Sequence, residues 1–165
     1  MAVQAKTSQV QIRVTPRQKA ALKRRASAAG LDVSTFVLSR ALPGLADQFG
    51  ELIRGVGDES RSRFALAELN TFLTEAAPAE FADATTHAEL RRLSPYLQNY
   101  VAAMVEQAAH LKHVAPPAWV RDVEPLDAPY FAASLKSLRP HLIAASPVAF
   151  KRRNLFVDAS IGDRV

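Results

Sequence analysis

The first forty-four residues are predicted to form one short strand and two helices, which is too little chain to close a hydrophobic core alone. Val10, Ile12 and Val14 alternate with polar residues, and this period of two is typical of a strand with one buried face. A lone strand has two open edges. Pairing it with its copy in a second chain would cover an edge of each strand and bury both apolar faces. The sequence therefore predicts a homodimer.

The first helix has clear signals at both ends. Thr15 is a good N-cap, Pro16 fits the first helical position, and Gln18 completes a capping box. The helix is expected to run to about Ala29, with Gly30 as the residue just beyond its C-cap. A second helix is expected from residues 32–34 to residues 43–44.

Charge is distributed unevenly along the chain, whose net charge is +5. Residues 1–44 hold eight Lys or Arg against one acid, a net charge of +7. Residues 45–114 have a net charge of −4, and residues 115–165 have +2. A strongly basic first quarter suggests that a polyanion binds there. The alternative is a basic arm that only keeps the protein in solution.

Residues 9–42 resemble the ribbon-helix-helix family of the Arc, MetJ and CopG type. The resemblance lies in the order of strand, Thr15-Pro16, helix, Ala29-Gly30-Leu31, helix and Arg40-Ala41-Leu42. It implies an intertwined homodimer whose two-stranded antiparallel ribbon enters the major groove of double-stranded DNA. The outward side chains of the ribbon would then read bases, and in this sequence they are Gln9, Gln11 and Arg13.

The chemistry of these side chains agrees with that role, because Arg pairs bidentately with guanine and Gln with adenine. The resemblance also implies that the N-terminus of the second helix binds a phosphate, a role that Ser34 and Thr35 fit. Asp32 departs from the family pattern, since its carboxylate would repel a phosphate. Further phosphate contacts are expected from basic residues of the first helix, although a solvated helix face is an equally good interpretation: Arg17, Lys19, Lys23 and Arg24.

Residues 45–60 are interpreted as a linker or a loosely helical hinge, because three glycines interrupt a weakly helical pattern. Residues 61–115 are predicted to form a small helical bundle. Its expected helices cover about residues 61–77 and 86–93, and a long one starts at Ser94-Pro95 and ends near Leu111.

Residues 116–165 are expected to be an irregular segment that binds a partner. Prolines alternate there with aromatic residues, and such a segment is usually extended and attached through its aromatic side chains to a neighbouring surface. Pro140 is expected to kink or shorten a helix between Leu135 and Leu142. The alternatives are that Trp119 and Phe131 are core residues and that the basic cluster is a solvated turn. The predicted partner-binding residues are Trp119, Tyr130, Phe131, Lys151, Arg152 and Arg153.

Residues 95–165 also resemble a C-terminal module of bacterial antitoxins that are encoded beside nucleotidyltransferase-like toxins. The resemblance is carried by residues 100–109, by Pro117-Ala118-Trp119, by Pro129-Tyr130-Phe131 and by residues 146–158. It implies a cognate toxin protein as the partner.

No catalytic motif stands out. The absence of cysteine excludes a disulfide scaffold, a thiolate zinc site and a cysteine nucleophile. His110 and His113 have the spacing of a metal pair on a helix, but no carboxylate motif completes it, and a solvated helix end is the better interpretation. The chain is therefore expected to be a non-enzymatic protein without a cofactor.

Together these patterns predict a mainly α fold and favour an antitoxin that binds operator DNA through its ribbon and neutralises a toxin through its C-terminal region. One alternative is a stand-alone ribbon-helix-helix repressor whose C-terminal domain senses a ligand or builds oligomers. Another is an enzyme with an unrecognised site near His110 and His113. With no apolar run long enough to span a bilayer and no signal-like N-terminus, a cytoplasmic protein without a membrane partner is expected.

Overall fold

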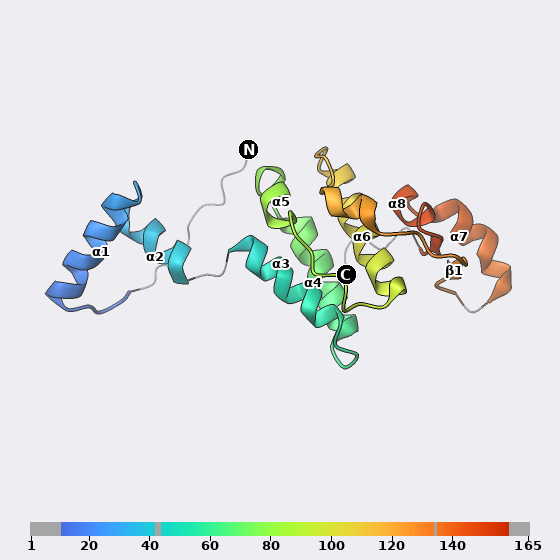
Figure 1. The fold of residues 1–165 in the computed structure, drawn as a ribbon, viewed down its shortest axis with the longest axis horizontal. Helices are drawn as coiled ribbons and strands as arrows, with labels where there is room; N and C mark the ends of the chain where they lie inside the picture. Colours follow the sequence, from blue (N-terminus) through green and yellow to red (C-terminus); the bar gives the residue numbers. More distant parts are fainter. Residues whose placement is uncertain (1–10, 42–43, 134, 159–165) are drawn as a thin grey trace. The chain divides into compact units, whose positions relative to one another are not determined.

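The computed structural model describes residues 11–41, 44–133 and 135–158, which are mainly helical, as the sequence predicts (Figure 1). The chain divides into two units, Met1–Pro43 and Gly44–Val165. Within the described residues, no helix is both long enough and apolar enough to span a membrane.

The first unit contains helices α1 (Pro16–Ala28) and α2 (Val33–Ala41). The predicted capping box at the start of α1 is confirmed. The backbone N–H of Gln18 donates to Thr15 Oγ1 at 3.3 Å, and the backbone N–H of Thr15 donates to Gln18 Oε1 at 2.9 Å. Two of the free donors at the helix start are thereby satisfied by side chains only three residues apart.

The predicted end of α1 is also confirmed. Gly30 has φ +68°, in the left-handed region that favours glycine. The N–H of Leu31 donates to the carbonyl of Ala26, and that of Gly30 donates to the carbonyl of Ser27. This pair of hydrogen bonds is a Schellman motif.

The predicted strand before α1 is not confirmed. Residues 11–14 have no regular secondary structure, while Gln9 and Val10 lie outside the described residues. An intermolecular ribbon forms its hydrogen bonds between two chains, so a single chain cannot display it.

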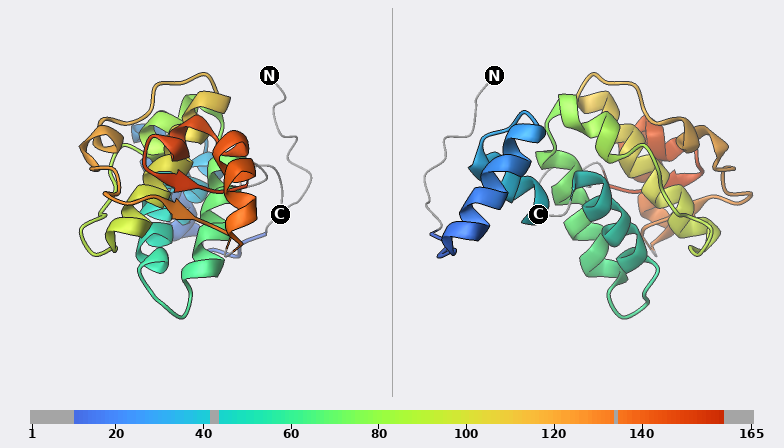
Figure 2. Two further views of the ribbon diagram at one scale, coloured as in Figure 1. Left: turned by 90° about the vertical axis from the view of Figure 1, so that its right-hand side faces the viewer. Right: turned by 60° about the vertical axis from the view of Figure 1, so that its left-hand side comes forward.

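The second unit is built around helix α6 (Pro95–Leu111). This helix packs against α4 (Ser62–Glu75), α8 (Val148–Lys151) and the short helix η1 (Ala118–Asp122). Successive residues 101–105 are all buried, so α6 contacts its neighbours on most of its circumference. Its predicted N-cap is confirmed, because Ser94 Oγ accepts from the N–H of Leu97. Figure 2 shows α6 between the earlier and the later helices of the unit. The earlier ones are α3 (Leu45–Val56), α4 (Ser62–Glu75) and α5 (Pro78–Ala84).

The prediction of a linker over residues 45–60 is wrong, because residues 45–56 form α3. Phe49, Ile53 and Val56 of this helix are completely buried in the core of the unit. A Cβ placed on Gly55 would lie only 3.1 Å from the Cβ of Ala65 in α4. The glycine therefore permits two helices to approach closely, and it does not mark a flexible hinge.

The helix predicted over residues 86–93 is also wrong. Helix α4 ends at Glu75, close to the predicted end near residue 77, and Pro78 occupies the first turn of the next helix, α5. Thr86 does not cap a new helix, because its hydroxyl donates back to the carbonyl of Ala82 at 2.7 Å. Residues 87–94 form turns and irregular chain that lead to α6.

Residues 116–158 are not the irregular segment that the sequence predicted, because they pack against the other helices of the second unit. Phe150, Leu155 and Val157 are buried in the same core as α3. Pro140 lies in the first turn of α7 and does not kink a longer helix. The strands β1 and β2 pair in parallel over two residues each. The elements are η1 (Ala118–Asp122), β1 (Tyr130–Phe131), η2 (Lys136–Leu138), α7 (Arg139–Ala145), α8 (Val148–Lys151) and β2 (Leu155–Phe156).

Candidate nucleic-acid interface

The basic side chains of the first unit are available to a polyanion. Gln11 and Arg13 are exposed, whereas Gln9 lies outside the described residues. The predicted phosphate-binding residues of α1 are all exposed, and no ion pair between described residues neutralises them: Arg17, Lys19, Lys23 and Arg24. Four unneutralised cations within eight residues produce a locally positive potential that attracts phosphate groups.

The N-terminus of α2 already holds a carboxylate. Asp32 accepts two hydrogen bonds from Thr35, one from the backbone N–H at 3.0 Å and one from the hydroxyl at 2.5 Å. The side chain of Asp32 thus occupies the position at which the resemblance would place a phosphate oxygen. Ser34 is exposed beside it. A phosphate contact by Thr35 requires Asp32 to rotate away, whereas one by Ser34 does not.

The first unit leaves much of its apolar surface uncovered. Among those residues of 11–41 whose burial the structure describes, only Ala26 and Phe36 are buried. Ile12 and Val14, the expected inward face of the ribbon, are 65% and 41% exposed. A hollow between α1 and α2 is lined mostly by apolar residues, among them Leu22, Ala29, Phe36 and Val37. These side chains would be covered by a second copy of the unit.

The aromatic residues proposed as partner contacts mostly contact their own unit. The indole N–H of Trp119 donates to the carbonyl of Thr85 at 2.8 Å, and the ring packs on the core. Phe131 stacks on Phe156 with ring centroids 4.8 Å apart. The guanidinium carbon of Arg139 lies 4.7 Å from the centroid of the Phe131 ring. Trp119 and Phe131 therefore pack against neighbouring parts of their own unit, and their binding of a partner stays a prediction.

All three tyrosines of the chain lie together in the second unit. The rings of Tyr96 and Tyr130 are 4.5 Å apart, and Tyr100 packs edge-on against Phe150. Burial, and next the hydrogen bond with Tyr130, raise the pKa of Tyr96 far above its ordinary value. Burial also raises the pKa of Tyr100. Both phenols stay protonated at neutral pH, so neither is prepared to act as a phenolate nucleophile.

Lys151, Arg152 and Arg153 do not form one basic surface, which corrects the sequence interpretation. Arg153 is buried: its Nη2 donates to the carbonyl of Val120 at 2.8 Å and to Glu106 Oε2 at 3.2 Å. Arg152 is exposed and pairs with the other oxygen of Glu106, while Lys151 Nζ donates to the carbonyl of Ala144. Successive residues of a helical turn point in different directions. Glu106 lies 47 residues before Arg153, so no local pattern announced the pair.

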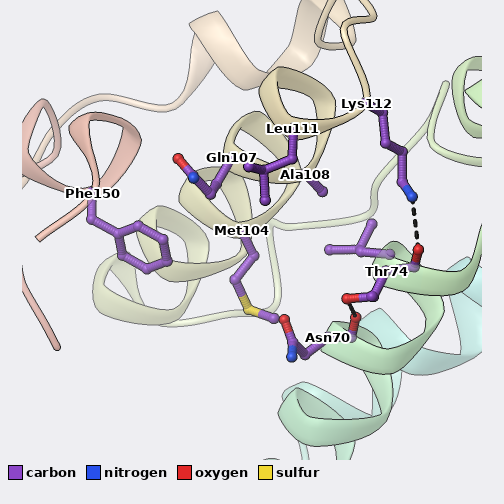
Figure 3. Close-up of a pocket in the computed structure, with 9 residues that line it drawn as sticks. Asn70, Thr74, Met104, Gln107, Ala108, Leu111, Lys112 and Phe150 are labelled. Atoms are coloured by element: carbon purple, nitrogen blue, oxygen red, sulfur yellow. Dashed lines mark hydrogen bonds between the residues drawn. The ribbon is translucent and has the colours of Figure 1, made fainter. Parts of the chain in front are cut away.

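A small apolar pocket lies between α4, α6 and α8 (Figure 3). Leu73, Met104 and Phe150 contribute its apolar lining. At one end Lys112 Nζ donates to the carbonyl of Thr74 at 2.8 Å, and burial lowers the pKa of Lys112. The volume of about 170 Å³ suits one apolar side chain and is below the usual size of a cofactor site.

The proposed histidine pair does not share a helix face. Helix α6 ends at Leu111, and His113 lies beyond it with φ +57°. Across the part of the chain that the structure describes, no cluster of three or more His, Cys, Asp or Glu residues could hold a metal ion.

Comparison with known proteins finds a match to one protein family, in the N-terminal part of the chain. Residues 4–71 match the NikA-like family model, described as mobilization protein NikA, which is a ribbon-helix-helix family. The match extends past the first unit through α3 and into α4. No curated protein and no solved structure matches the chain. The match supports an N-terminal DNA-binding region of the ribbon-helix-helix type and gives no support to an antitoxin.

Proposed function

We propose that this protein is a homodimer that recognises a specific DNA sequence through a ribbon formed by residues 9–14 of both chains. The observation that carries the proposal is the match of residues 4–71 to a ribbon-helix-helix family. Gln9, Gln11 and Arg13 are the base-reading residues of the proposal. Its phosphate contacts come from α1, through Arg17, Lys19, Lys23 and Arg24, and from the start of α2, through Ser34 and Thr35.

The uncovered apolar surface of the first unit supports the dimer. Ile12 and Val14 are exposed in the single chain although both are large and apolar. Burying such side chains contributes about 1.5–3 kcal/mol each, which is a strong drive toward association. Because the same pairing turns the polar face of each strand outward, dimerisation and DNA reading follow from one arrangement.

The matched family favours a role in DNA mobilization over toxin neutralisation. The role in DNA mobilization relies on the description of the matched family as a mobilization protein. Toxin neutralisation relies on the resemblance of residues 95–165 to antitoxins. Its proposed anchors have contacts within their own unit, among them Trp119, Phe131 and Arg153. In either role we propose a binding protein and not an enzyme.

Selection from a library of randomised DNA duplexes tests sequence recognition directly. The full chain should enrich one motif composed of two half-sites, as expected for a symmetric dimer. Arg13→Ala should weaken binding to that motif by about 10–100-fold, because a bidentate Arg–guanine contact contributes about 1–3 kcal/mol. Arg121→Ala removes the same side chain from the exposed surface of the second unit and should leave binding unchanged. Enrichment of no motif would refute base reading.

Salt dependence tests the phosphate contacts separately. If about six phosphates are neutralised, the logarithm of the binding constant should fall with the logarithm of salt concentration with a slope near −5. Lys19→Ala and Lys23→Ala should each reduce this slope by about one without changing the selected motif. A slope near zero would contradict the basic interface.

Co-expression with the product of the neighbouring gene separates mobilization from toxin neutralisation. A toxic neighbour whose growth inhibition is relieved by this chain would support the antitoxin alternative. Transfer of a plasmid that carries the selected motif, measured with and without the chain, would support mobilization if the transfer frequency depends on both.

A further inference from the structure

The second unit carries opposite charges on opposite sides of α6. From residue 64 to residue 88 there are four acids, Glu68, Glu75, Glu80 and Asp83, and no Lys or Arg. From residue 135 to residue 153 there are five bases, Lys136, Arg139, Lys151, Arg152 and Arg153, and no acid. Figure 1 shows α4 and α5 on one side of α6 and α7 and α8 on the other.

The acidic side has one protruding apolar residue. Phe64 is 73% exposed and begins a row of residues on α4 at spacings of four, three and four, which continues with Glu68, Thr71 and Glu75. These spacings place all four side chains on one helix face, and all four are exposed. Glu68 and Glu75 form no ion pair with any described residue. This row is called the α4 face below.

The basic side has a row of exposed residues that begins at Leu135, directly before η2, and continues through η2 and α7. Leu135, Arg139 and Ile143 follow one another at spacings of four, and Lys136 lies beside Leu135. Leu135 is 63% exposed and Ile143 is 48% exposed, so apolar side chains alternate with cations. Neither Lys136 nor Arg139 has an ion-pair partner in the described part of the chain. This row is called the η2–α7 face.

We propose that second units of neighbouring molecules associate head to tail, with the α4 face of one copy against the η2–α7 face of the next. Helix α6 lies between the two faces, so one copy cannot neutralise its own charges. A second copy presents the opposite charge and an apolar partner at once. Exposed ion pairs alone contribute little, and Phe64 against Leu135 and Ile143 supplies the apolar centre that a specific interface needs.

The contact joins two different faces, and such heterologous contacts form chains of molecules instead of closed pairs. A protein that dimerises through its first unit would thereby line up successive dimers. The alternative occupant of the η2–α7 face is DNA. The cations of this face suit DNA, whereas the exposed apolar side chains of Leu135 and Ile143 do not, because protein–DNA interfaces are polar and positively charged.

Sedimentation velocity of the full chain without DNA tests the association. In about 0.05 M salt the average mass should grow with protein concentration. In about 0.5 M salt the average mass should return to that of the unassociated species, because salt then limits the attraction between charges to a few ångströms. The reference is the high-salt species, whether monomer or dimer, so the result does not depend on the proposed N-terminal dimer or on DNA binding.

Charge exchange provides the decisive comparison. The variants Glu68→Lys/Glu75→Lys and Lys136→Glu/Arg139→Glu should each stay at the high-salt species, whereas an equal mixture of the two should associate at least tenfold more tightly than either alone. Restored association also shows that both variants are folded. Phe64→Ser, which changes no charge, should weaken association of the otherwise unchanged chain about tenfold.

Two controls change net charge by the same amount at exposed positions outside both faces. Arg91→Glu/Arg92→Glu matches the basic-face variant, and Asp122→Lys/Asp127→Lys matches the acidic-face variant. Both should associate as the unchanged chain does. The proposal is overturned if the unchanged chain does not associate, if the mixture fails to associate, or if Lys136→Glu/Arg139→Glu lowers affinity for a random-sequence duplex while self-association is unchanged.

Discussion

The two units of this chain differ in how much apolar surface they bury by themselves. In the described part of the first unit, Ala26 and Phe36 are the only residues found buried, and Ile12 and Val14 are exposed. In the second unit, one core joins helices and strands from α3 to β2. The second unit therefore has the interior of an independent domain, whereas the first has apolar faces that fit a partner.

The units also differ in charge, and the differences in burial and in charge have the same explanation. The first forty-four residues have a net charge of +7, and the remaining residues have −2 in total. A unit that buries little and carries dense positive charge is stabilised by what it binds, which in the proposed function is a second copy and DNA. A unit with a closed core can instead present side chains on its surface for other contacts.

The largest expected effect concerns the core of the second unit. Phe49→Ala should lower the free energy of unfolding of this unit by about 3–5 kcal/mol, because it leaves a cavity where α3 packs. Phe64→Ala makes the same chemical change at an exposed position and should cost less than about 0.5 kcal/mol. Denaturant titration followed by circular dichroism measures both. Equal effects would return residues 45–56 to the status of a linker.

The next effect concerns the buried arginine. Arg153→Met should destabilise the second unit by about 3 kcal/mol, because it leaves Glu106 Oε2 and the carbonyl of Val120 without their donor. Arg152→Met removes an exposed partner of the same carboxylate and should cost less than about 1 kcal/mol. The same denaturant titration compares them. If Arg153→Met left the free energy of unfolding unchanged, water would have replaced the hydrogen bonds of the guanidinium.

The stabilities of the two units should depend differently on protein concentration, which is a smaller effect than the two above. Each tenfold dilution should destabilise the first unit by about 1.4 kcal/mol if it folds only as a dimer, since association then enters its folding equilibrium. The second unit should unfold at the same denaturant concentration throughout, if measured in high salt. Fluorescence of Trp119 reports the second unit alone, and helical circular dichroism reports both. Coincident transitions at every concentration would contradict the comparison.

The smallest effects concern two helix ends of the same type. Gly30 follows α1 and His113 follows α6, both with positive φ and both within a Schellman motif. Gly30→Ala should destabilise the first unit by about 1 kcal/mol, and His113→Gly should stabilise the second by a similar amount. Thermal unfolding of the full chain measures both shifts. If His113→Gly left the unfolding temperature unchanged, the histidine would make a contact that compensates for its positive φ.

Much of the candidate DNA-binding unit could be predicted from the sequence. The capping box of α1, its glycine end and the span of α2 all depend on residues within a few positions of one another. The exposure of Arg13 and of the α1 cations follows from the same short-range pattern. The ribbon itself stays a prediction, because its hydrogen bonds lie between two chains.

The sequence by itself determined the helix ends at Thr15, Gly30 and Ser94 and the mainly α character of the chain, because caps and helical periods act within one or two turns. Only the tertiary structure decided that Gly55 marks a close helix contact and that Arg153 faces inward while Arg152 faces solvent. Those outcomes depend on Ala65 in another helix and on Glu106, 47 residues before Arg153. Packing brings such distant partners together, and a local pattern carries no record of them.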